Sequence, residues 1–532
     1  MIRGEKMNVR VHNIKLPLDA NVDEIKYEAL KAAGAKECDC KAFKIAKQSV
    51  DARKKQVSFV YSIDLELTKK VKTNGTNVVE LIIEEEKEII TGNIKLAHRP
   101  IVVGSGPCGL FCALTLARKG YMPLLLERGA DVDTRTKAVH NFWQNRNFSP
   151  DTNVQFGEGG AGTFSDGKLT TRISDPKIMK ILSEFVKFGA PEEILYKAKP
   201  HIGTDILKNV VKAIRNEIIR LGGEVRFNSK VSDLDISGNK IRSVRLSSGE
   251  EIPCNVLVLA LGHSARDTYK MLFDKGILMQ AKAFSVGARI EHKQQFINEA
   301  MYGGFAGHKL LGAADYQLSY RNGDDACYSF CMCPGGVVVA AASEENTVVT
   351  NGMSYFARDE ENSNAAICVN VTRKDFESEH PLSGVKYQQK LEKRAFNLGG
   401  SNYNAPAQSV SDFLNGKRSY KFLSVKPSYA PDVTPVDLCD MFSQRVSKIL
   451  SDGLRQFERK INSFTKNGAI LTGPETRTSA PVRILRNDEF ESCSAKGVYP
   501  AGEGAGYAGG IMSAAVDGIK VAEKIISIYC VL

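Results

Sequence analysis

Residues 99–129, RPIVVGSGPCGLFCALTLARKGYMPLLLERG, contain the pattern that decides the fold. The apolar run IVV leads directly into Gly104, Gly106 and Gly109, which have the spacing G-x-G-x-x-G. Apolar residues at helical spacing follow, and a second apolar run, LLL, ends at Glu127, eighteen residues after the last of these glycines. A strand, a helix, a second strand and an acid in this order predict a dinucleotide-binding site.

Each part of this pattern has a physical role. Gly104 permits the tight turn, and Gly106 carries no Cβ to block a pyrophosphate; Gly109 lets the helix pack closely on the strand. Amides at the helix N-terminus attract phosphate, and Glu127 can accept hydrogen bonds from the adenosine ribose. The alternative is a doubly wound turn that binds no ligand. The predicted cofactor site also includes Ser105, Pro107 and Arg128.

Length and composition indicate a globular protein of several domains. The chain has 532 residues, of which 43% are apolar and 25% charged, so two or three domains are expected. The net charge of +11 suits anionic ligands and does not by itself indicate nucleic acid. The first residues lack an apolar targeting segment, no run is long enough for a membrane span, and the twelve cysteines follow neither disulfide nor zinc spacing. We therefore expect a cytoplasmic location, no membrane partner and no metal site.

Residues 1–96 precede the dinucleotide pattern and predict a separate domain. A strand at MNVRVHNIKL, a helix over 22–33 and strands at AFKIAK and VSFVYSIDLEL fit a ferredoxin-like α+β domain, while LIIEEEKEII fits either a strand or a helix. Basic residues gather between Lys41 and Lys55. They favour either a patch for RNA or an acidic partner, or the ordinary solvated face of a small domain.

A second glycine-rich stretch, FGEGGAGTFSDGKLTTR, occupies residues 156–172. So many glycines exclude a helix or a packed strand and predict a loop whose backbone lies against a ligand. In flavoproteins of this architecture such a loop follows the pyrophosphate and the flavin, which places Gly159, Gly160 and Gly162 in the cofactor site. Lys168 then either stabilises negative charge on a reduced flavin or is an ordinary surface lysine.

The central part of the chain predicts two helices and a series of strands. Residues 176–189 and 204–221 have helical periodicity, the second with Thr204 or Asp205 as its cap. Four or five strands follow between residues 222 and 262, separated by turn signals. Flavoproteins of the glutathione-reductase type have the same series, so we place the backbone of Val231 near the adenine and Gly262 at the closing turn.

The last glycine-rich segment, AGEGAGYAGGIM at 501–512, follows a short strand and precedes a helix. In FAD-binding folds an acid after this strand bonds the ribitol, and a helix N-terminus points at the flavin. The residues predicted for this half of the site are Gly502, Glu503, Gly509, Gly510 and Ile511. Because only the longer cofactor needs both ends of the fold, the two patterns together favour FAD over NAD.

The chain also resembles the bacterial family of uncharacterised FAD-dependent dehydrogenases, called NAD(FAD)-utilising dehydrogenases. The resemblance is carried by SVDARKK, FGEGGAGTFSDGKL, PHIGTD, FSVGARIEH, YSFCMCPGG, NGMSY, ETRTSAPVRI and PAGEGAGYAGGIMSAAVDG. These segments cover nearly the whole chain. The resemblance implies FAD, a two-lobed oxidoreductase fold and a ferredoxin-like N-terminal domain, and it supplies no substrate.

Together these patterns predict an α/β protein built around a doubly wound, Rossmann-like FAD domain of the glutathione-reductase type. We expect an N-terminal ferredoxin-like domain at 1–96, the first part of the FAD domain at 97–265, an inserted α+β substrate lobe at 266–480 and the remainder of the FAD domain at 481–532. No second G-x-G-x-x-G with a strand and an acid occurs, which argues against a separate NAD(P)H domain.

The candidate catalytic residues are Lys168, Cys331 and Arg477. Cys331 and Cys333 share a face in a regular strand, so they are either two thiols at one pocket or small packing residues. Arg477 is either a clamp for a substrate carboxylate or part of an ion pair between the lobe and the nucleotide domain. His292 is more readily explained as a structural histidine than as a proton donor. Two further cysteines, at 108 and 112, are expected to pack on the sheet.

The sequence thus favours an FAD-dependent oxidoreductase that transfers hydride through flavin N5 to or from a small organic substrate, with NAD(P)H as a candidate transient reductant. One alternative is a flavoprotein that binds or modifies RNA through its basic N-terminal domain. Another is a scaffold in which FAD is purely structural.

Overall fold

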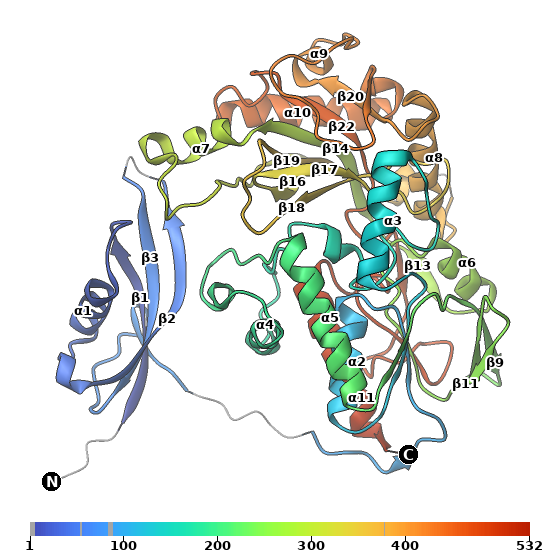
Figure 1. The fold of residues 1–532 in the computed structure, drawn as a ribbon, viewed down its shortest axis with the longest axis horizontal. Helices are drawn as coiled ribbons and strands as arrows, with labels where there is room; N and C mark the ends of the chain where they lie inside the picture. Colours follow the sequence, from blue (N-terminus) through green and yellow to red (C-terminus); the bar gives the residue numbers. More distant parts are fainter. Residues whose placement is uncertain (1–5, 54–55, 83–88, 377, 532) are drawn as a thin grey trace.

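The computed structural model describes residues 6–53, 56–82, 89–376 and 378–531. Figure 1 shows a small N-terminal domain beside a larger body, in which the helices around the nucleotide-binding sheet lie beneath the sheet of the inserted lobe. No helix in the described part of the chain is long and apolar enough to cross a lipid bilayer.

The N-terminal domain is a four-stranded antiparallel sheet covered by one helix. Its strands have the order β2-β3-β1-β4. Residues 68–77, between β3 and β4, contain no helix, so the second helix of a β-α-β-β-α-β fold is missing there. The prediction for residues 81–90 falls largely on 83–88, outside the described residues. The bounds are β1 (Met7–Leu16), α1 (Val22–Ala33), β2 (Cys40–Asp51), β3 (Ser58–Leu67) and β4 (Val78–Glu80).

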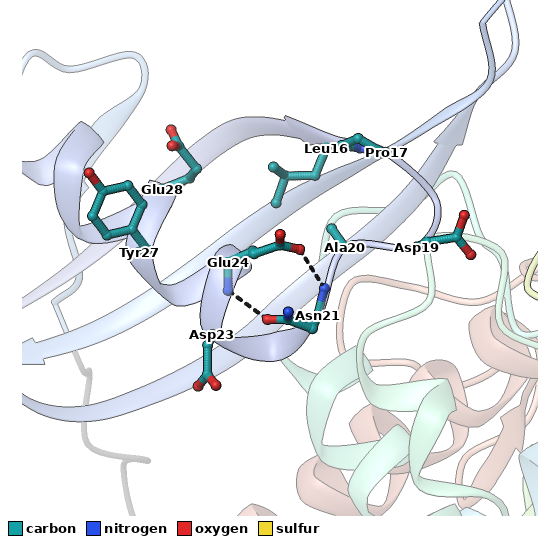
Figure 2. A pocket seen from close by; sticks show the side chains of 9 residues that line it. All are labelled: Leu16, Pro17, Asp19, Ala20, Asn21, Asp23, Glu24, Tyr27 and Glu28. Atoms are coloured by element: carbon teal, nitrogen blue, oxygen red, sulfur yellow. Dashed lines mark hydrogen bonds between the residues drawn. The ribbon is translucent and has the colours of Figure 1, made fainter.

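The predicted helix over 22–33 is confirmed as α1. Asn21 caps it, and the Glu24 side chain accepts a hydrogen bond from the Asn21 amide in return. A hollow of about 720 Å³ lies beside this cap and is lined by acidic side chains. Figure 2 shows that Glu24 reaches back to the cap instead of into open space. The hollow is lined only by residues of the N-terminal domain and by none of the glycine-rich segments.

The basic stretch at 41–55 is partly neutralised within the domain. Lys41 pairs with Glu66 at 2.9 Å, and Arg53 pairs with Asp51 at 2.8 Å. Residues 54 and 55 lie outside the described residues. Such exposed pairs contribute little to stability, and they reduce the positive charge that the surface offers to an acidic partner. RNA binding by this domain therefore stays a prediction.

The nucleotide-binding sheet has five parallel strands in the order β24-β12-β6-β7-β8. The strands are β6 (Ile101–Val103), β7 (Leu124–Leu126), β8 (Glu224–Arg226), β12 (Leu257–Leu259) and β24 (Val498–Pro500). Val102 faces the helices α2 (Pro107–Arg118), α5 (Thr204–Arg220) and α11 (Ile511–Ile528). Ile101 and Val103 face the opposite core, which a three-stranded meander covers. The sheet is therefore buried on both faces, as a parallel sheet requires.

The meander consists of β9 (Val231–Ser237), β10 (Lys240–Leu246) and β11 (Glu251–Pro253). With β8 and β12 it makes five strands between residues 222 and 262, which confirms the expected four or five. The helix predicted over 176–189 is confirmed as α4 (Lys177–Lys187), and that over 204–221 as α5. The predicted cap of α5 is wrong, because Gly203 is the N-cap. The Thr204 hydroxyl instead donates to the Thr163 carbonyl, and Asp205 accepts from the Phe356 amide.

The inserted lobe is built on a seven-stranded sheet with the order β15-β16-β19-β14-β22-β20-β21. Figure 1 shows α9 and α10 on the side of this sheet away from the nucleotide-binding helices, and the hairpin β17/β18 on the near side. The strands are β14 (Phe284–Lys293), β15 (Ser319–Asn322), β16 (Asp325–Cys333), β17 (Gly336–Ala340), β18 (Thr350–Ser354), β19 (Asn362–Val371), β20 (Ala405–Ser409), β21 (Val433–Pro435) and β22 (Ile470–Glu475).

Further helices and two short strand pairs complete the body. The pair β13 (Met279–Ala281) and β23 (Val482–Ile484) joins the start of the lobe to the chain that leaves it. The pair β5 (Ile94–Lys95) and β25 (Tyr529–Cys530) fastens the linker after the N-terminal domain to the end of α11. The remaining helices are α3 (Val132–Asn145), α6 (Arg266–Asp274), α7 (Gln294–Tyr302), α8 (Ser383–Leu398), α9 (Val410–Leu414) and α10 (Gln444–Lys460).

Candidate functional site

The first glycine-rich turn leaves no room for side chains. Gly104 has φ +101°, and a Cβ there would lie 2.3 Å from the Ala260 carbonyl oxygen. A Cβ on Gly109 would lie 1.8 Å from the Gly104 carbonyl oxygen. These approaches are too close for any residue but glycine, so the turn can bring α2 directly against β6. The N-terminus of α2 begins at Pro107, at the carboxyl edge of the parallel sheet.

The three glycine-rich segments meet at this edge. A Cβ on Gly160 would lie 3.0 Å from the Gly106 Cα, and one on Gly162 would lie 3.2 Å from Cγ1 of Ile511. Pro107, Gly159, Gly162 and Ile511 also border one narrow apolar crevice of about 10 Å³ between the helices, so the three segments pack against a common core. Residues separated by about four hundred positions in the sequence therefore form one cradle. Its backbone composition and its two helix N-termini fit a dinucleotide that spans the sheet edge.

The close approach of Gly160 to Gly106 gives a testable prediction. In Gly160→Ala, the new Cβ meets the Gly106 backbone, and φ +62° is strained for alanine. We expect about a tenfold or greater loss of FAD affinity, measured by fluorescence titration, because each 1.4 kcal/mol of misfit weakens binding tenfold. Gly304→Ala is the matched control, since a Cβ there meets nothing within 4 Å. Equal FAD affinity in the two variants would contradict this cradle.

Glu127 is buried, and protein donors occupy both of its carboxylate oxygens. One oxygen accepts from the Ser105 amide at 2.9 Å and the Ser105 hydroxyl at 2.7 Å. The other accepts from the amides of Gly129 and Gly157 at 2.9 and 3.0 Å. In this structure Glu127 joins the first glycine-rich turn to the second. Its contact with an adenosine ribose stays a prediction.

Three other predicted cofactor residues have protein contacts of their own. Arg128 forms ion pairs with Asp151 at 2.7 Å and Asp267 at 2.9 Å. The Val231 side chain packs in the core beneath the meander, so only its backbone can meet a ligand. Gly262 has φ +70°, and a Cβ there would enter open space. Their roles toward a cofactor stay predictions.

Arg135 is a functional candidate that sequence analysis missed. It is fully buried and donates four hydrogen bonds to backbone carbonyls, those of Asn153, Val154, Gly157 and Glu158. Burial lowers its pKa to about 10, so the guanidinium is still charged at neutral pH. Arg135 thereby fixes the path of the second glycine-rich loop. An arginine on an amphipathic helix gives no local sign of such a role.

The closing loop presents a carboxyl group and the N-terminus of α11. The Glu503 carboxylate accepts from the Gly510 amide at 3.1 Å and lies 4.0 Å from Nε2 of His263. Burial raises the Glu503 pKa to about 6. A Cβ on Gly509 or Gly510 would meet no atom within 4 Å. An incompletely bonded acid beside an open helix N-terminus fits the predicted contacts of a flavin and its ribityl hydroxyls.

The raised pKa of Glu503 predicts a pH-dependent stability of the FAD-free protein. Because the folded protein holds the proton more tightly than the unfolded chain, ionisation of Glu503 costs stability as pH rises from about 4.5 to 6. Glu503→Gln should therefore stabilise the FAD-free protein by about 2 kcal/mol at pH 8 and by little at pH 4.5. Thermal unfolding of both proteins at the two pH values measures this. An equal effect at both pH values would contradict a raised pKa of Glu503 in the folded protein.

Lys168 and Cys331, two of the three catalytic candidates, lie in one cluster. Lys168 is 3.4 Å from Asp166, which also binds Arg358 at 2.5 Å. Burial alone would lower the Lys168 pKa, but Asp166 and the thiols of Cys333 and Cys331 raise it. Lys168 therefore carries its charge in a largely enclosed position instead of on the open surface. It follows the short helical turn at Ala161–Phe164 that ends the second glycine-rich loop.

Arg477 belongs to a different, fully buried cluster. It donates to both oxygens of Glu392, at 2.9 and 3.1 Å, and to the hydroxyls of Ser264 and Ser343. Arg266 binds the same Glu392 carboxylate at 2.6 Å. Because Ser264 and Arg266 follow β12 and Glu392 lies on α8, this cluster joins the nucleotide-binding part to the lobe. The structure thus shows Arg477 in an ion pair between the lobe and the nucleotide-binding part, which is the second of the two roles considered for it.

This cluster predicts a large loss of stability when Glu392 is removed. Glu392→Ala leaves two buried guanidinium groups without their shared carboxylate, so we expect about 3–5 kcal/mol of destabilisation in urea unfolding. Glu345→Ala, on the exposed surface nearby, should change the free energy of unfolding by about 0.5 kcal/mol or less. A comparable effect of both substitutions would show that the cluster does not hold the lobe.

The remaining candidate residues, one histidine and two cysteines, are buried and have structural roles. His292 is buried, bonded through Nε2 to the Phe464 carbonyl at 2.7 Å, and burial lowers its pKa to about 4. It is therefore neutral at physiological pH, as expected of a structural histidine. Cys108 and Cys112 are buried in the core between α2 and the other helices. Burial raises the pKa of both thiols, so they are unreactive packing residues.

Comparison with known proteins supports this architecture. Residues 283–478 match the family described as FAD-dependent protein, C-terminal domain-like; residues 102–151 match an NAD(P)-binding Rossmann-like domain, and residues 8–66 a domain of unknown function. A protein of Clostridium beijerinckii, described as an uncharacterized protein, is 49% identical over 98% of this chain and 99% of its own length. Digeranylgeranylglycerophospholipid reductase of Haloferax volcanii is 26% identical over 31% of this chain and 35% of its own length.

Among solved structures, the flavin-dependent brominase Bmp2 aligns with 80% of this chain and 77% of its own, at 12% identity and a TM-score of 0.36. A geranylgeranyl bacteriochlorophyll reductase-like protein from Thermoplasma acidophilum aligns with 81% of this chain and 78% of its own, at 11% identity and a TM-score of 0.34. These scores are too low to support conclusions about reaction or substrate. The full-length relative and the matched domains establish that the chain belongs to an uncharacterised family of FAD-dependent proteins.

Proposed function

We propose that this protein is an FAD-dependent oxidoreductase that transfers hydride through flavin N5 to or from an organic substrate. The observation that carries the proposal is the meeting of the three glycine-rich segments at one sheet edge, beneath the sheet of the lobe. FAD, when bound, supplies the two-electron chemistry, and the protein supplies position and charge. Resemblance to a reductase over part of the chain supports the same reaction class.

The chain's own residues have distinct tasks in this proposal. The N-terminus of α11 and its neighbours Gly509 and Gly510 would offer a positive potential to bound FAD, which would favour negative charge on the cofactor. Glu503 would accept a hydrogen bond from the cofactor. Lys168, held by Asp166, would add positive charge to the site. The lobe encloses the site and excludes water, which strengthens these electrostatic effects.

A transient reductant completes the proposal. NAD(P)H is the natural candidate, bound without a second dinucleotide domain of its own, since the sequence has no second dinucleotide pattern. It would have to enter the same site as the organic substrate, so the two would bind alternately. This arrangement predicts ping-pong kinetics once the organic substrate is known.

The first experiment is spectroscopic. Purified protein should be yellow, should release FAD on denaturation, and should lose its flavin absorbance anaerobically with NADH or NADPH, or otherwise with dithionite. A colourless protein that does not bind added FAD would contradict the proposal. A bound flavin that no reductant bleaches would instead indicate that FAD is structural.

A further inference from the structure

The strand β16 is interrupted by a bulge at Cys331. Phe330 lies opposite Ala366 of β19 and Cys333 lies opposite Asn364, so β16 has one residue more than its partner across this interval. Cys331 has φ +44°, in the region that favours glycine. Strained backbone of this kind persists where the surroundings enforce it, and it is concentrated at functional sites.

Arg289 enforces this backbone. Its Nη1 donates to the Cys331 carbonyl at 2.7 Å, and its Nε donates to Glu475 at 2.9 Å. Arg289 is fully buried, and Glu475 nearly so. The bulge is therefore fixed by a buried ion pair that spans β14 and β22. The bulge changes the direction of the two side chains, so Cys331 and Cys333 do not have the spacing of a regular strand.

The two thiols lie at the bulge beside two cations. The Cys333 thiol donates to the Cys331 carbonyl oxygen at 3.4 Å, and the same oxygen accepts from Nη1 of Arg289 at 2.7 Å. The Cys333 sulfur and Nη1 of Arg289 lie 2.8 and 2.5 Å from the point that a Cβ on Gly352 would occupy. The neighbouring Cys333 thiol, together with the positive charges of Arg289 and Lys168, lowers the pKa of Cys331, while the pKa of Cys333 is raised. One thiolate beside one thiol is the arrangement that thiol–disulfide exchange requires.

Unpartnered polar atoms surround the pair. Nδ2 of Asn364 and the hydroxyl of Tyr316 are buried and have no hydrogen-bond partner within the described structure. Asn364 lies directly opposite Cys333 in the sheet, and its Oδ1 accepts from Arg289. Buried polar atoms without a protein partner are usually bonded to ordered water, so this place has hydrogen-bonding capacity for water or for a polar substrate.

We propose that Cys331 and Cys333 form a redox-active dithiol and that the organic substrate of the proposed oxidoreductase is a disulfide. This inference rests on the proposed function, because the reduced flavin supplies the electron pair. The pair is distinct from Cys108 and Cys112, which are packed in the core and whose thiols stay protonated because burial raises the pKa of both.

The exchange balances as follows. The Cys331 thiolate attacks one sulfur of the substrate disulfide, the substrate S–S bond breaks, and one thiol leaves with a proton. The Cys333 thiol then loses its proton and attacks the Cys331 sulfur, which releases the second thiol and leaves a Cys331–Cys333 disulfide. Two electrons and two protons restore the dithiol; the electrons come from the reduced flavin, which NAD(P)H or another hydride donor regenerates.

The decisive experiment counts electrons in the FAD-loaded protein. The protein is treated with hydroxyethyl disulfide, freed of excess reagent and titrated anaerobically with dithionite. Wild type should consume two electron pairs per FAD, whereas Cys331→Ser and Cys333→Ser should consume one. Cys439→Ser, which removes an exposed thiol, is the matched control and should behave as wild type. One electron pair in wild type, or no difference between wild type and the Cys331 variant, overturns the proposal.

A second measurement does not depend on the flavin. Mass spectrometry after iodoacetamide labelling follows the pH dependence of Cys331 alkylation, and the same method detects the Cys331–Cys333 disulfide. Lys168→Met should reduce the labelling rate at pH 6 about tenfold or more, because one pKa unit changes the thiolate fraction tenfold. If FAD is bleached by a reductant but no such disulfide forms, the dithiol is wrong and the oxidoreductase stands. If the disulfide forms in protein that cannot bind FAD, the dithiol stands and the proposed FAD-dependent oxidoreductase is wrong.

Discussion

The structure depends on the close approach of α2 and α11. A Cβ on Gly518 would lie 2.1 Å from the Cys108 carbonyl oxygen, and one on Gly502 would lie 2.8 Å from Cβ of Cys108. The two helices can pack backbone to backbone only because residue 518 is glycine, and the loop before α11 can approach α2 only because residue 502 is glycine. This contact joins residues near the start of the nucleotide-binding part to residues at the end of the chain. Without it, the two halves of the cofactor cradle would be separate.

Strand pairing and a buried ion-pair cluster position the inserted lobe. The chain leaves the parallel sheet after β12 and returns at β24, which lies next to β12. Both ends of the lobe are therefore fixed to one edge of the sheet, and the buried cluster of Arg266, Arg477 and Glu392 locks the lobe above it. Lys168, on the second glycine-rich loop, interacts electrostatically with the two thiols of β16. The chemistry of the site is thus divided between a cofactor cradle made of backbone and a lobe that carries charged and thiol side chains.

The sequence predicted those features that depend on local pattern. The G-x-G-x-x-G turn, the helix over 22–33 and the strands between 222 and 262 all require particular residues at short spacing, and the structure confirms them. Contacts between distant segments could not be predicted in this way. Arg135 binds carbonyls about twenty residues away, and Glu127 joins two loops about fifty residues apart, at Ser105 and Gly157.

The bulge at Cys331 shows the same limit. A regular strand predicts that Cys331 and Cys333 share a face, but the register of β16 against β19 decides their environment, and local periodicity does not encode that register. The missing helix in the N-terminal domain has a related cause. The strand pattern at 58–67 is compatible with several connections, and residues 68–77 form a loop.

The central claim is that three segments from distant parts of the chain hold one FAD molecule. Hydrogen–deuterium exchange of the FAD-free and FAD-loaded protein tests it most directly. We expect FAD to protect the amides of residues 104–109, 157–163 and 502–512 together, with the α11 N-terminus included. Protection confined to the first segment, with the closing loop unchanged, would contradict the account.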